Sequence, residues 1–241
     1  MPFQSTSSVL PLPSTPHNWT MTTPTWAHFL AFINSTPAPE DELDYFRSLP
    51  WTKDYLDNPE FKAVQTTSRI PKSTNDDNFF ARTLQGDDTI QHWLALIPKA
   101  FVPLPQQTDT PPIGTLNGRT TRKIRDTHQS DLLLLLHLNN GLNGFADVVH
   151  GGALCAIFDE ALSFCVEARR QLTTDARELI YTAKLTISYL APVRSPSTVV
   201  VKCWLEAAHG RKWYVRGQLI GEDGTIYSEA EGLWVSAGQK L

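Results

Sequence analysis

The sequence predicts an α+β fold in which an antiparallel sheet wraps around one long central helix, after a mostly helical or irregular N-terminal extension. Three observations support this prediction. Residues 153–170 contain neither glycine nor proline and are largely apolar, which indicates a helix. Residues 131–138, "DLLLLLHL", form a continuous apolar run that is typical of a buried strand. Four strand-like segments follow the helix, and tight turns join most of them.

The expected central helix covers residues 151–170. Between Ala153 and Val166 its residues are apolar on almost every side, so other elements must cover most of its surface. Arg169 and Arg170 suit the partial negative charge at the end of a helix. The helix is therefore expected at the centre of its domain.

The strands of the predicted sheet lie on both sides of this helix in the sequence. Before it, the run 131–138 is followed by "NNGLNG" (139–144), a loop whose residues accept positive φ. After it, residues 185–192 alternate, with Leu185, Ile187 and Tyr189 on one face, and Pro192 ends the strand. Three more strands are expected at 198–208, 211–220 and 225–235, separated by the turns "HG" and "GEDG".

The N-terminal half differs from the rest of the chain in its composition and in its expected secondary structure. Residues 1–24 are rich in Ser, Thr and Pro and predict a flexible arm. Residues 25–117 predict an extension of short helices and loops, with helix starts at 37–49 and 58–65 and a strand or ordered edge segment at 78–84. The prolines within 103–117 predict a connector. Residues 118–241 then form the main domain.

Composition limits the classes of function. The chain has 241 residues and a formal net charge of −4, which favours neither nucleic acid nor an anionic membrane as a partner. No segment is long and apolar enough to predict a transmembrane helix. The three cysteines show no metal-ligand spacing and no disulfide framework. We therefore expect a cytoplasmic protein without a bound metal.

The stretch "VHGGALCAIFDE" (149–160) carries the clearest chemical signal. The first N–H groups of a helix have no partner within it and carry partial positive charge. With no side chain at Gly151 or Gly152, a ligand oxygen can approach these groups closely, as in an oxyanion hole. Alternatively, the two glycines only permit a tight turn into the helix.

Asp159 stands in the apolar body of the same helix. It is either a partly desolvated carboxylate that acts as base or nucleophile, or the edge of a solvated stripe formed by Glu160, Ser163 and Glu167. Gly151 and Asp159 are eight residues apart, so they lie about 12 Å apart along a helix. If both act on one carbonyl, they must come from two chains, which predicts a symmetric dimer with two equivalent sites.

Two motifs together resemble a known family. "VHGGALCAIFDEALSF" (149–164), followed by "YTAKLTISYLAP" (181–192), resembles the hotdog-fold acyl-CoA thioesterases. The match is to the branch of the phenylacetate-pathway thioesterases and the thioesterase-superfamily members, and it covers about residues 118–236. The resemblance implies a hotdog fold, an acyl-CoA or acyl-carrier thioester as substrate, and a homodimer, with a tetramer as the alternative.

The resemblance also implies roles for individual residues. The Gly151 N–H would hold the thioester carbonyl oxygen, with Gly152 beside the substrate and His150 shaping or polarising that corner. Asp159 of the partner subunit would activate water or attack directly, and Thr182 would position the carboxylate or the water. The family often has Asn six residues before the motif histidine, where this chain has Gly144. Asn143, one residue further out, is the remaining candidate for that role. No cofactor is implied, because water is the second substrate.

Two other functions fit the same fold. One is a hydratase, a dehydratase or a pathway-specific cyclase of a biosynthetic cluster. Hydratases of this fold usually place four residues between their Asp and His, whereas "DVVH" (147–150) places two. The other is a dimer that binds acyl thioesters without turning them over. An assay for free thiol released from acyl-CoA distinguishes hydrolysis from these two alternatives.

Overall fold

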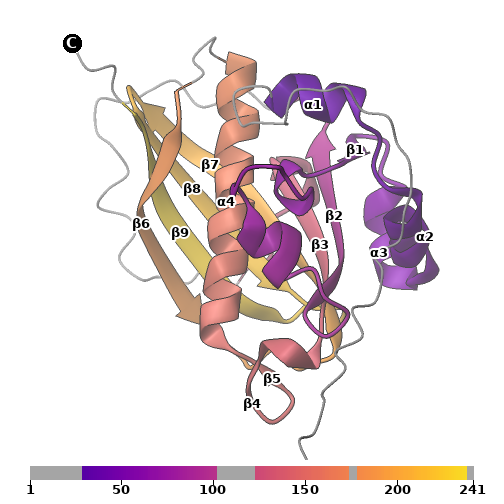
Figure 1. Ribbon diagram of the computed structural model, residues 1–241. Helices are drawn as coiled ribbons and strands as arrows, with labels where there is room; N and C mark the ends of the chain where they lie inside the picture. Colours follow the sequence, from indigo (N-terminus) through magenta and orange to yellow (C-terminus); the bar gives the residue numbers. More distant parts are fainter. Residues whose placement is uncertain (1–28, 102–122, 174–177, 238–241) are drawn as a thin grey trace, which may run out of the picture.

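The structure, a computed structural model, describes residues 29–101, 123–173 and 178–237 (Figure 1). The arm expected at 1–24 and the connector expected at 103–117 lie outside these residues. In the described parts of the chain, no helix is both long and apolar enough to cross a membrane.

An antiparallel sheet of seven strands dominates the described residues. Its strands, in spatial order, are β1 (Phe61–Val64), β2 (Ile90–Pro98), β3 (Leu132–Leu138), β7 (Ser197–His209), β8 (Lys212–Ile220), β9 (Ile226–Ser236) and β6 (Ile180–Tyr189). Two short strands, β4 (Asn143–Phe145) and β5 (Val148–Val149), form a separate pair directly before the long helix. The four strands expected after the helix are confirmed, but the first, expected at 185–192, begins at Ile180 and ends at Tyr189, before Pro192.

The long helix α4 (Gly151–Thr173) lies against the sheet, which curves around it (Figure 1). Its residues Ile157, Phe158 and Leu162 are fully buried in the core. At Gly217 of β8, a side-chain Cβ would lie 3.2 Å from Leu162, so glycine there lets the helix pack closely on the sheet. The expected α+β class, and the hotdog arrangement of an antiparallel sheet around one central helix, are confirmed.

The all-leucine strand β3 is apolar on both faces because both faces are covered. Leu132, Leu134 and Leu136 pack in the core around α4. Leu133 and Leu135 pack on the other side of the sheet, in a cluster with residues of α2 (Glu40–Ser48) and α3 (Pro50–Leu56). A strand buried on both faces reads as a continuous apolar run rather than an alternating one.

The N-terminal half contributes more sheet than the sequence predicted. Its helices are α1 (Phe29–Ser35), α2 and α3. The strands β1 and β2 also come from this range, at positions where the sequence analysis expected no strand. The helix start expected at 58–65 is wrong, because Phe61–Val64 pairs with β2.

The strand expected at 78–84 is also wrong. Phe79–Thr83 forms one turn of π-helix, with Phe80 and Ala81 buried. The buried Arg69 explains this conformation, because its guanidinium donates to the carbonyl oxygens of Phe80 (3.2 Å) and Leu84 (3.1 Å). In a strand, these carbonyl oxygens would accept hydrogen bonds from a neighbouring strand. Here they accept hydrogen bonds from Arg69 instead. Figure 1 shows this segment, between β1 and β2, lying across α4.

Candidate active site

The histidine before α4 has a defined protonation pattern. The backbone N–H of Gly152 donates to Nδ1 of His150 at 2.8 Å. Because a backbone N–H can only donate, Nδ1 must be the unprotonated nitrogen of a neutral imidazole. The proton then lies on Nε2, which can donate a hydrogen bond to another group. The ring itself is exposed.

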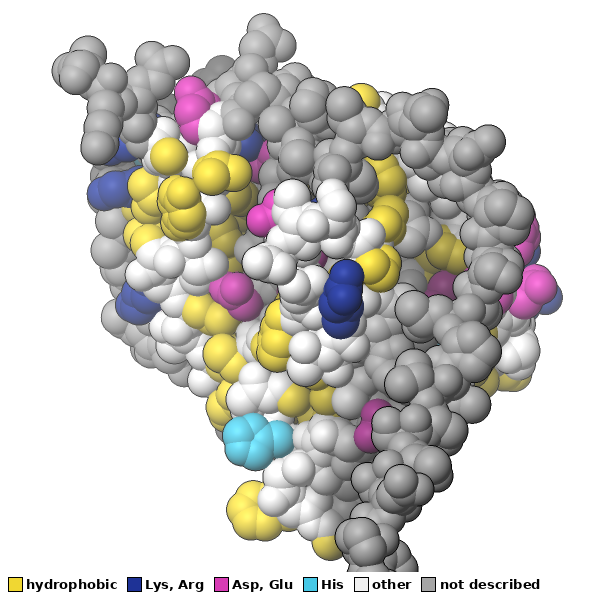
Figure 2. Space-filling view, in the orientation of Figure 1, with side chains coloured by type: hydrophobic (Ala, Val, Ile, Leu, Met, Phe, Trp, Pro, Cys, Tyr) yellow, Lys and Arg dark blue, Asp and Glu magenta, His cyan; other side chains and the backbone are white. Residues whose placement is uncertain are grey.

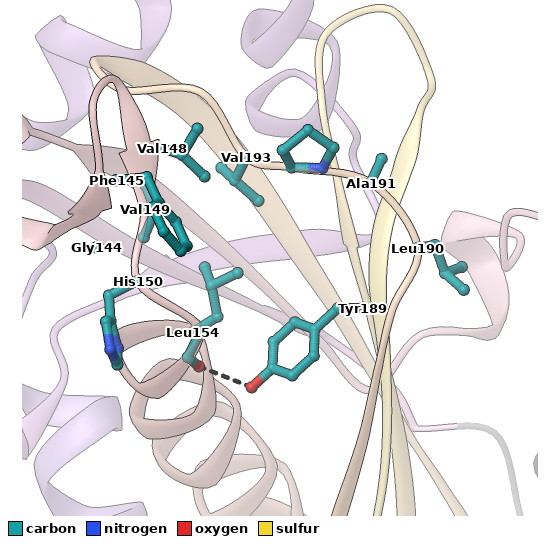
Figure 3. A pocket seen from close by; sticks show the side chains of 12 residues that line it. Gly144, Phe145, Val148, Val149, His150, Leu154, Tyr189, Leu190, Ala191 and Val193 are labelled. Carbon is teal, nitrogen blue, oxygen red and sulfur yellow. Dashed lines mark hydrogen bonds between the residues drawn. The ribbon is translucent and has the colours of Figure 1, made fainter.

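The peptide group between the two glycines is held at both ends. Its N–H donates to His150, and its oxygen, from Gly151, accepts a hydrogen bond from the Tyr189 hydroxyl at 2.8 Å (Figure 3). A side-chain Cβ at position 151 would lie 3.3 Å from the Tyr189 ring. Within the described residues, the N–H of Gly151 itself has no hydrogen-bond acceptor. The start of α4 therefore presents one oriented, unused donor.

A pocket of about 550 Å³ lies beside this donor (Figure 3). Aliphatic and aromatic side chains form most of its wall, and none of its lining residues is Asp, Glu, Lys or Arg. Such a lining suits an uncharged apolar group. The lining residues are Gly144, Phe145, Val148, Val149, His150, Gly151, Leu154, Tyr189, Leu190, Ala191, Pro192 and Val193.

Asn143 and Gly144 occupy different environments. The side-chain oxygen of Asn143 accepts a hydrogen bond from the Ser195 hydroxyl, and Asn143 does not line the pocket. Gly144 does line it, and a Cβ there would lie only 2.7 Å from Cδ2 of His150. The imidazole of His150 therefore occupies the space that a side chain at position 144 would need.

Asp159 and Thr182 are in direct contact. The Thr182 hydroxyl donates to Oδ1 of Asp159 at 2.8 Å. A β-bulge makes this contact possible. Thr182 pairs with Trp234 on β9, but the next pair is Lys184 with Leu233, so Ala183 is an extra residue in β6. Side chains alternate along a strand, and the extra residue reverses the alternation. Thr182 consequently shares the inner face of β6 with Leu185.

A second cavity, of about 250 Å³, surrounds the Asp159–Thr182 contact. It shares no lining residue with the pocket at the start of α4. One chain therefore does not bring Gly151 and Asp159 to the same pocket. The lining residues are Asp77, Asp159, Glu160, Ser163, Glu167, Arg170, Glu178, Leu179, Ile180, Tyr181 and Thr182.

The polar stripe of α4 faces protein rather than water. Glu167 is fully buried, and both its oxygens accept hydrogen bonds from Arg170 at 2.9 Å. The Ser163 hydroxyl accepts a hydrogen bond from the Trp234 indole at 2.8 Å. The alternative of a solvated stripe is therefore wrong for these residues. Asp159 lies beside a buried polar layer.

Glu160 also belongs to this layer, and its environment perturbs its ionisation. Its Oε1 is buried and has no hydrogen-bond partner among the described residues. Burial raises the pKa of Glu160 to about 7, while the neighbouring Ser68 hydroxyl lowers this pKa and the nearby charges of Asp77 and Asp159 raise it.

Two residues of the site were missing from the sequence prediction. Tyr189 had a signal, because it is the last inward position in the alternating strand that was expected at 185–192. Glu160 had none, because the segment that buries it comes from a distant part of the chain. In the described ranges, no group of three or more His, Cys, Asp or Glu side chains is arranged to hold a metal ion.

Comparison with known proteins shows a match over the segment that contains both pockets' central residues, Gly151 and Asp159. Residues 146–228 match the family described as the thioesterase superfamily. This segment is similar to the thioesterase superfamily. The matched segment contains both the unused donor of Gly151 and the Asp159–Thr182 contact.

Mammalian relatives also match part of the chain. The acyl-coenzyme A thioesterase THEM4 of Bos taurus is 33% identical over 95 residues, which are 39% of this chain and 36% of that protein. THEM4 of Mus musculus is 34% identical over 101 residues, which are 42% of this chain and 39% of that protein. The chain therefore spans less than two fifths of the length of these curated relatives.

Solved structures resemble the domain more distantly. The E. coli PaaI protein from the phenylacetic acid degradation operon is 12% identical with a TM-score of 0.40, over 44% of this chain and 72% of that one. A hypothetical thioesterase from Streptococcus pneumoniae, solved with coenzyme A, is 16% identical with a TM-score of 0.41, over 49% of this chain and 88% of that one.

Proposed function

We propose that this protein hydrolyses an acyl thioester of coenzyme A or of a carrier protein to the free acid and the thiol. One observation carries the proposal. The segment that matches the thioesterase superfamily holds a carboxylate that accepts a hydrogen bond from Thr182, and the same helix begins with an unused N–H at Gly151. A base and an oxyanion donor are the two groups that thioester hydrolysis requires.

In the proposed reaction, the Gly151 N–H donates to the carbonyl oxygen of the thioester. The Nε2–H of His150 is a second donor at the same corner. Asp159 takes a proton from water as the water oxygen attacks the carbonyl carbon; direct attack by the carboxylate is the alternative. The tetrahedral intermediate then collapses, the C–S bond breaks, and the leaving sulfur takes the proton from Asp159. The partial positive charge at the start of α4 stabilises the negative oxygen.

The proposed site is formed by two copies of the chain. Gly151 and Asp159 lie about 12 Å apart on one helix and line separate pockets, so the partner's Asp159 must approach Gly151.

The strand β6 offers a surface for a second copy. It is the last strand of the sheet, and exposed hydrophobic side chains gather over it in Figure 2. Leu179, Tyr181 and Tyr189 are 54%, 57% and 53% exposed. Long apolar sheet edges tend to pair with another chain. These features support the homodimer.

The surroundings of the site support the remaining parts of the proposal. The apolar pocket beside Gly151 suits the acyl group of the substrate. Cys155, Cys165 and Cys203 are free thiols, which suits the reducing cytoplasm.

Thiol release from a panel of short, long and aryl acyl-CoAs tests the proposal, with Asp159→Asn alongside. We expect turnover by the wild type and its loss in Asp159→Asn, with both proteins forming the same dimer in sedimentation. Full activity in Asp159→Asn would refute the role of the carboxylate. Binding of acyl-CoA and of acyl-carrier protein without thiol release would refute hydrolysis.

A further inference from the structure

Next to Asp159, α4 carries a second carboxyl group that the proposed reaction does not use. Glu160 lines the same cavity as Asp159 and Thr182. Its Oε1 is removed from solvent and has no hydrogen-bond partner among the described residues. A carboxylate in such a position loses hydration at that oxygen, so burial favours the neutral acid more strongly than Ser68 and Lys72 favour the charged form.

The segment between β1 and β2 creates this environment. It places Ser68 and Asp77 beside Glu160, and both influence its ionisation. Lys72 lowers the pKa of Glu160, but burial is the larger effect. The Lys72 ammonium donates to the Thr67 carbonyl oxygen at 3.0 Å and forms an ion pair with Asp77, so its charge is shared with another carboxylate.

The charged groups around Glu160 come from α4, from the segment between β1 and β2 and from the residues just before β6. On α4 itself, the carboxylate of Asp159 is the neighbouring charge, and it opposes a second negative charge in the same cavity. Two adjacent carboxyl groups in one site divide their roles according to their surroundings, one staying ionised and the other protonated. Asp159 has a hydrogen-bond donor in Thr182, whereas Oε1 of Glu160 has none. The other charged groups that line or face the cavity are Lys72, Asp77, Glu167, Arg170 and Glu178.

We propose that Glu160 is a positioning residue for the reaction: it stays protonated beside Asp159 and leaves Asp159 as the single negative charge at that position. This inference rests on the proposed hydrolysis. The burial that raises the pKa of Glu160 to about 7 sets the limit of this arrangement. Above that pH, a second carboxylate opposes the negative charge that develops on the carbonyl oxygen, and turnover falls.

The test is the pH dependence of kcat in Glu160→Gln, whose amide resembles the protonated acid in shape and is uncharged. For the wild type, we expect kcat to fall about tenfold as the pH rises through about 7, where Glu160 loses its proton. Glu160→Gln should lack this fall, while its kcat on the acidic side and its KM stay within about twofold of the wild type.

Glu42 of α2 provides a matched control. Burial also raises its pKa to about 7, but it bonds to His92 and to the backbone of Trp93, away from the cavity. Glu42→Gln should therefore keep the fall in kcat near pH 7. The proposal is overturned if Glu160→Gln keeps the fall as well. It is also overturned if Glu160→Gln loses more than about a hundredfold in kcat at every pH, since Glu160 would then take part in the chemistry itself.

A readout without turnover separates this inference from the proposed function. A carbon-13 NMR titration of the glutamate carboxyl groups should show two signals that titrate near pH 7, one lost in Glu160→Gln and the other in Glu42→Gln. In Asp159→Asn, the midpoint of Glu160 should fall, because the charge of Asp159 raises the pKa of Glu160. Absence of a Glu160 signal near pH 7 would overturn the inference. If Glu160 titrates near pH 7 and responds to Asp159→Asn, but the protein hydrolyses no thioester, the protonated state of Glu160 is supported. Only the proposed hydrolysis is then refuted.

Discussion

Replacing Thr182 by valine tests whether the β-bulge of β6 serves the site. Valine has nearly the shape of threonine and is also β-branched, so the strand keeps its conformation. The substitution removes one interaction, the hydroxyl that donates to Oδ1 of Asp159 at 2.8 Å. We expect a specific loss of turnover rather than a loss of fold.

The size of the effect follows from the kind of hydrogen bond. A hydrogen bond to a charged group contributes about 1.5–3 kcal/mol when buried. Thr182 is exposed in one chain, so about 1–2 kcal/mol is the appropriate range. If this energy orients Asp159 only in the transition state, kcat falls about 5- to 30-fold and KM stays within about twofold. The free energy of unfolding should change by less than about 1 kcal/mol.

The control is Thr186→Val on the same strand. Thr186 pairs with Glu231 and lies on the outer face of β6, beyond the bulge. Steady-state thiol release and urea unfolding of both variants complete the comparison. A Thr182→Val protein with wild-type kcat would refute the reasoning, as would an equal loss of kcat in Thr186→Val.

Three further predictions address other parts of the site. First, Gly151→Pro removes the N–H of Gly151 but suits the first position of a helix, and should abolish turnover with the fold retained. Mixed with Asp159→Asn chains, it should restore about a quarter of the wild-type rate, because half of randomly paired dimers then contain one intact site; no recovery in verified mixed dimers would contradict the two-chain site. Second, Tyr189→Phe removes the hydrogen bond to the Gly151 oxygen and should lower kcat about two- to fivefold in the thiol-release assay; an unchanged kcat would show that this bond is dispensable. Third, Glu42 has its pKa raised from 4.5 to about 7 by burial, so the folded state binds an extra proton between these values and loses stability as the pH rises through them. The stability of Glu42→Gln relative to the wild type, measured by urea unfolding, should therefore grow by about 1–2 kcal/mol from about pH 5 to about pH 8; a difference that stays constant with pH would rule out the buried carboxyl as its cause.

The parts of the fold that local pattern controls could be predicted from the sequence. A helix that is apolar on almost every side has to be surrounded, and a run of five leucines has to be covered on both faces. Both requirements led to the sheet around α4. The motif with Gly151 and Asp159 likewise followed from residue types and spacing, as did the distance that keeps these two residues apart in one chain.

The sequence could not predict the features that depend on contacts between distant segments. Strict alternation from Leu185 would place Thr182 on the outer face, and only the pairing of β6 with β9 reveals the extra residue that turns it toward Asp159. The segment at 78–84 has the composition of a strand, but the guanidinium of Arg69 holds it in a helical turn.

Sequence by itself therefore determined the central helix, the sheet that surrounds it and the position of the candidate carboxylate, Asp159, along that helix. Local periodicity records which faces must avoid water, and this information is enough for those features. Only the tertiary structure decided that Thr182 contacts Asp159 and that Tyr189 holds the Gly151 peptide. It also decided that Oε1 of Glu160 is buried with no hydrogen-bond partner among the described residues. Orientation, desolvation and hydrogen bonding at a site depend on neighbours that are far away along the chain.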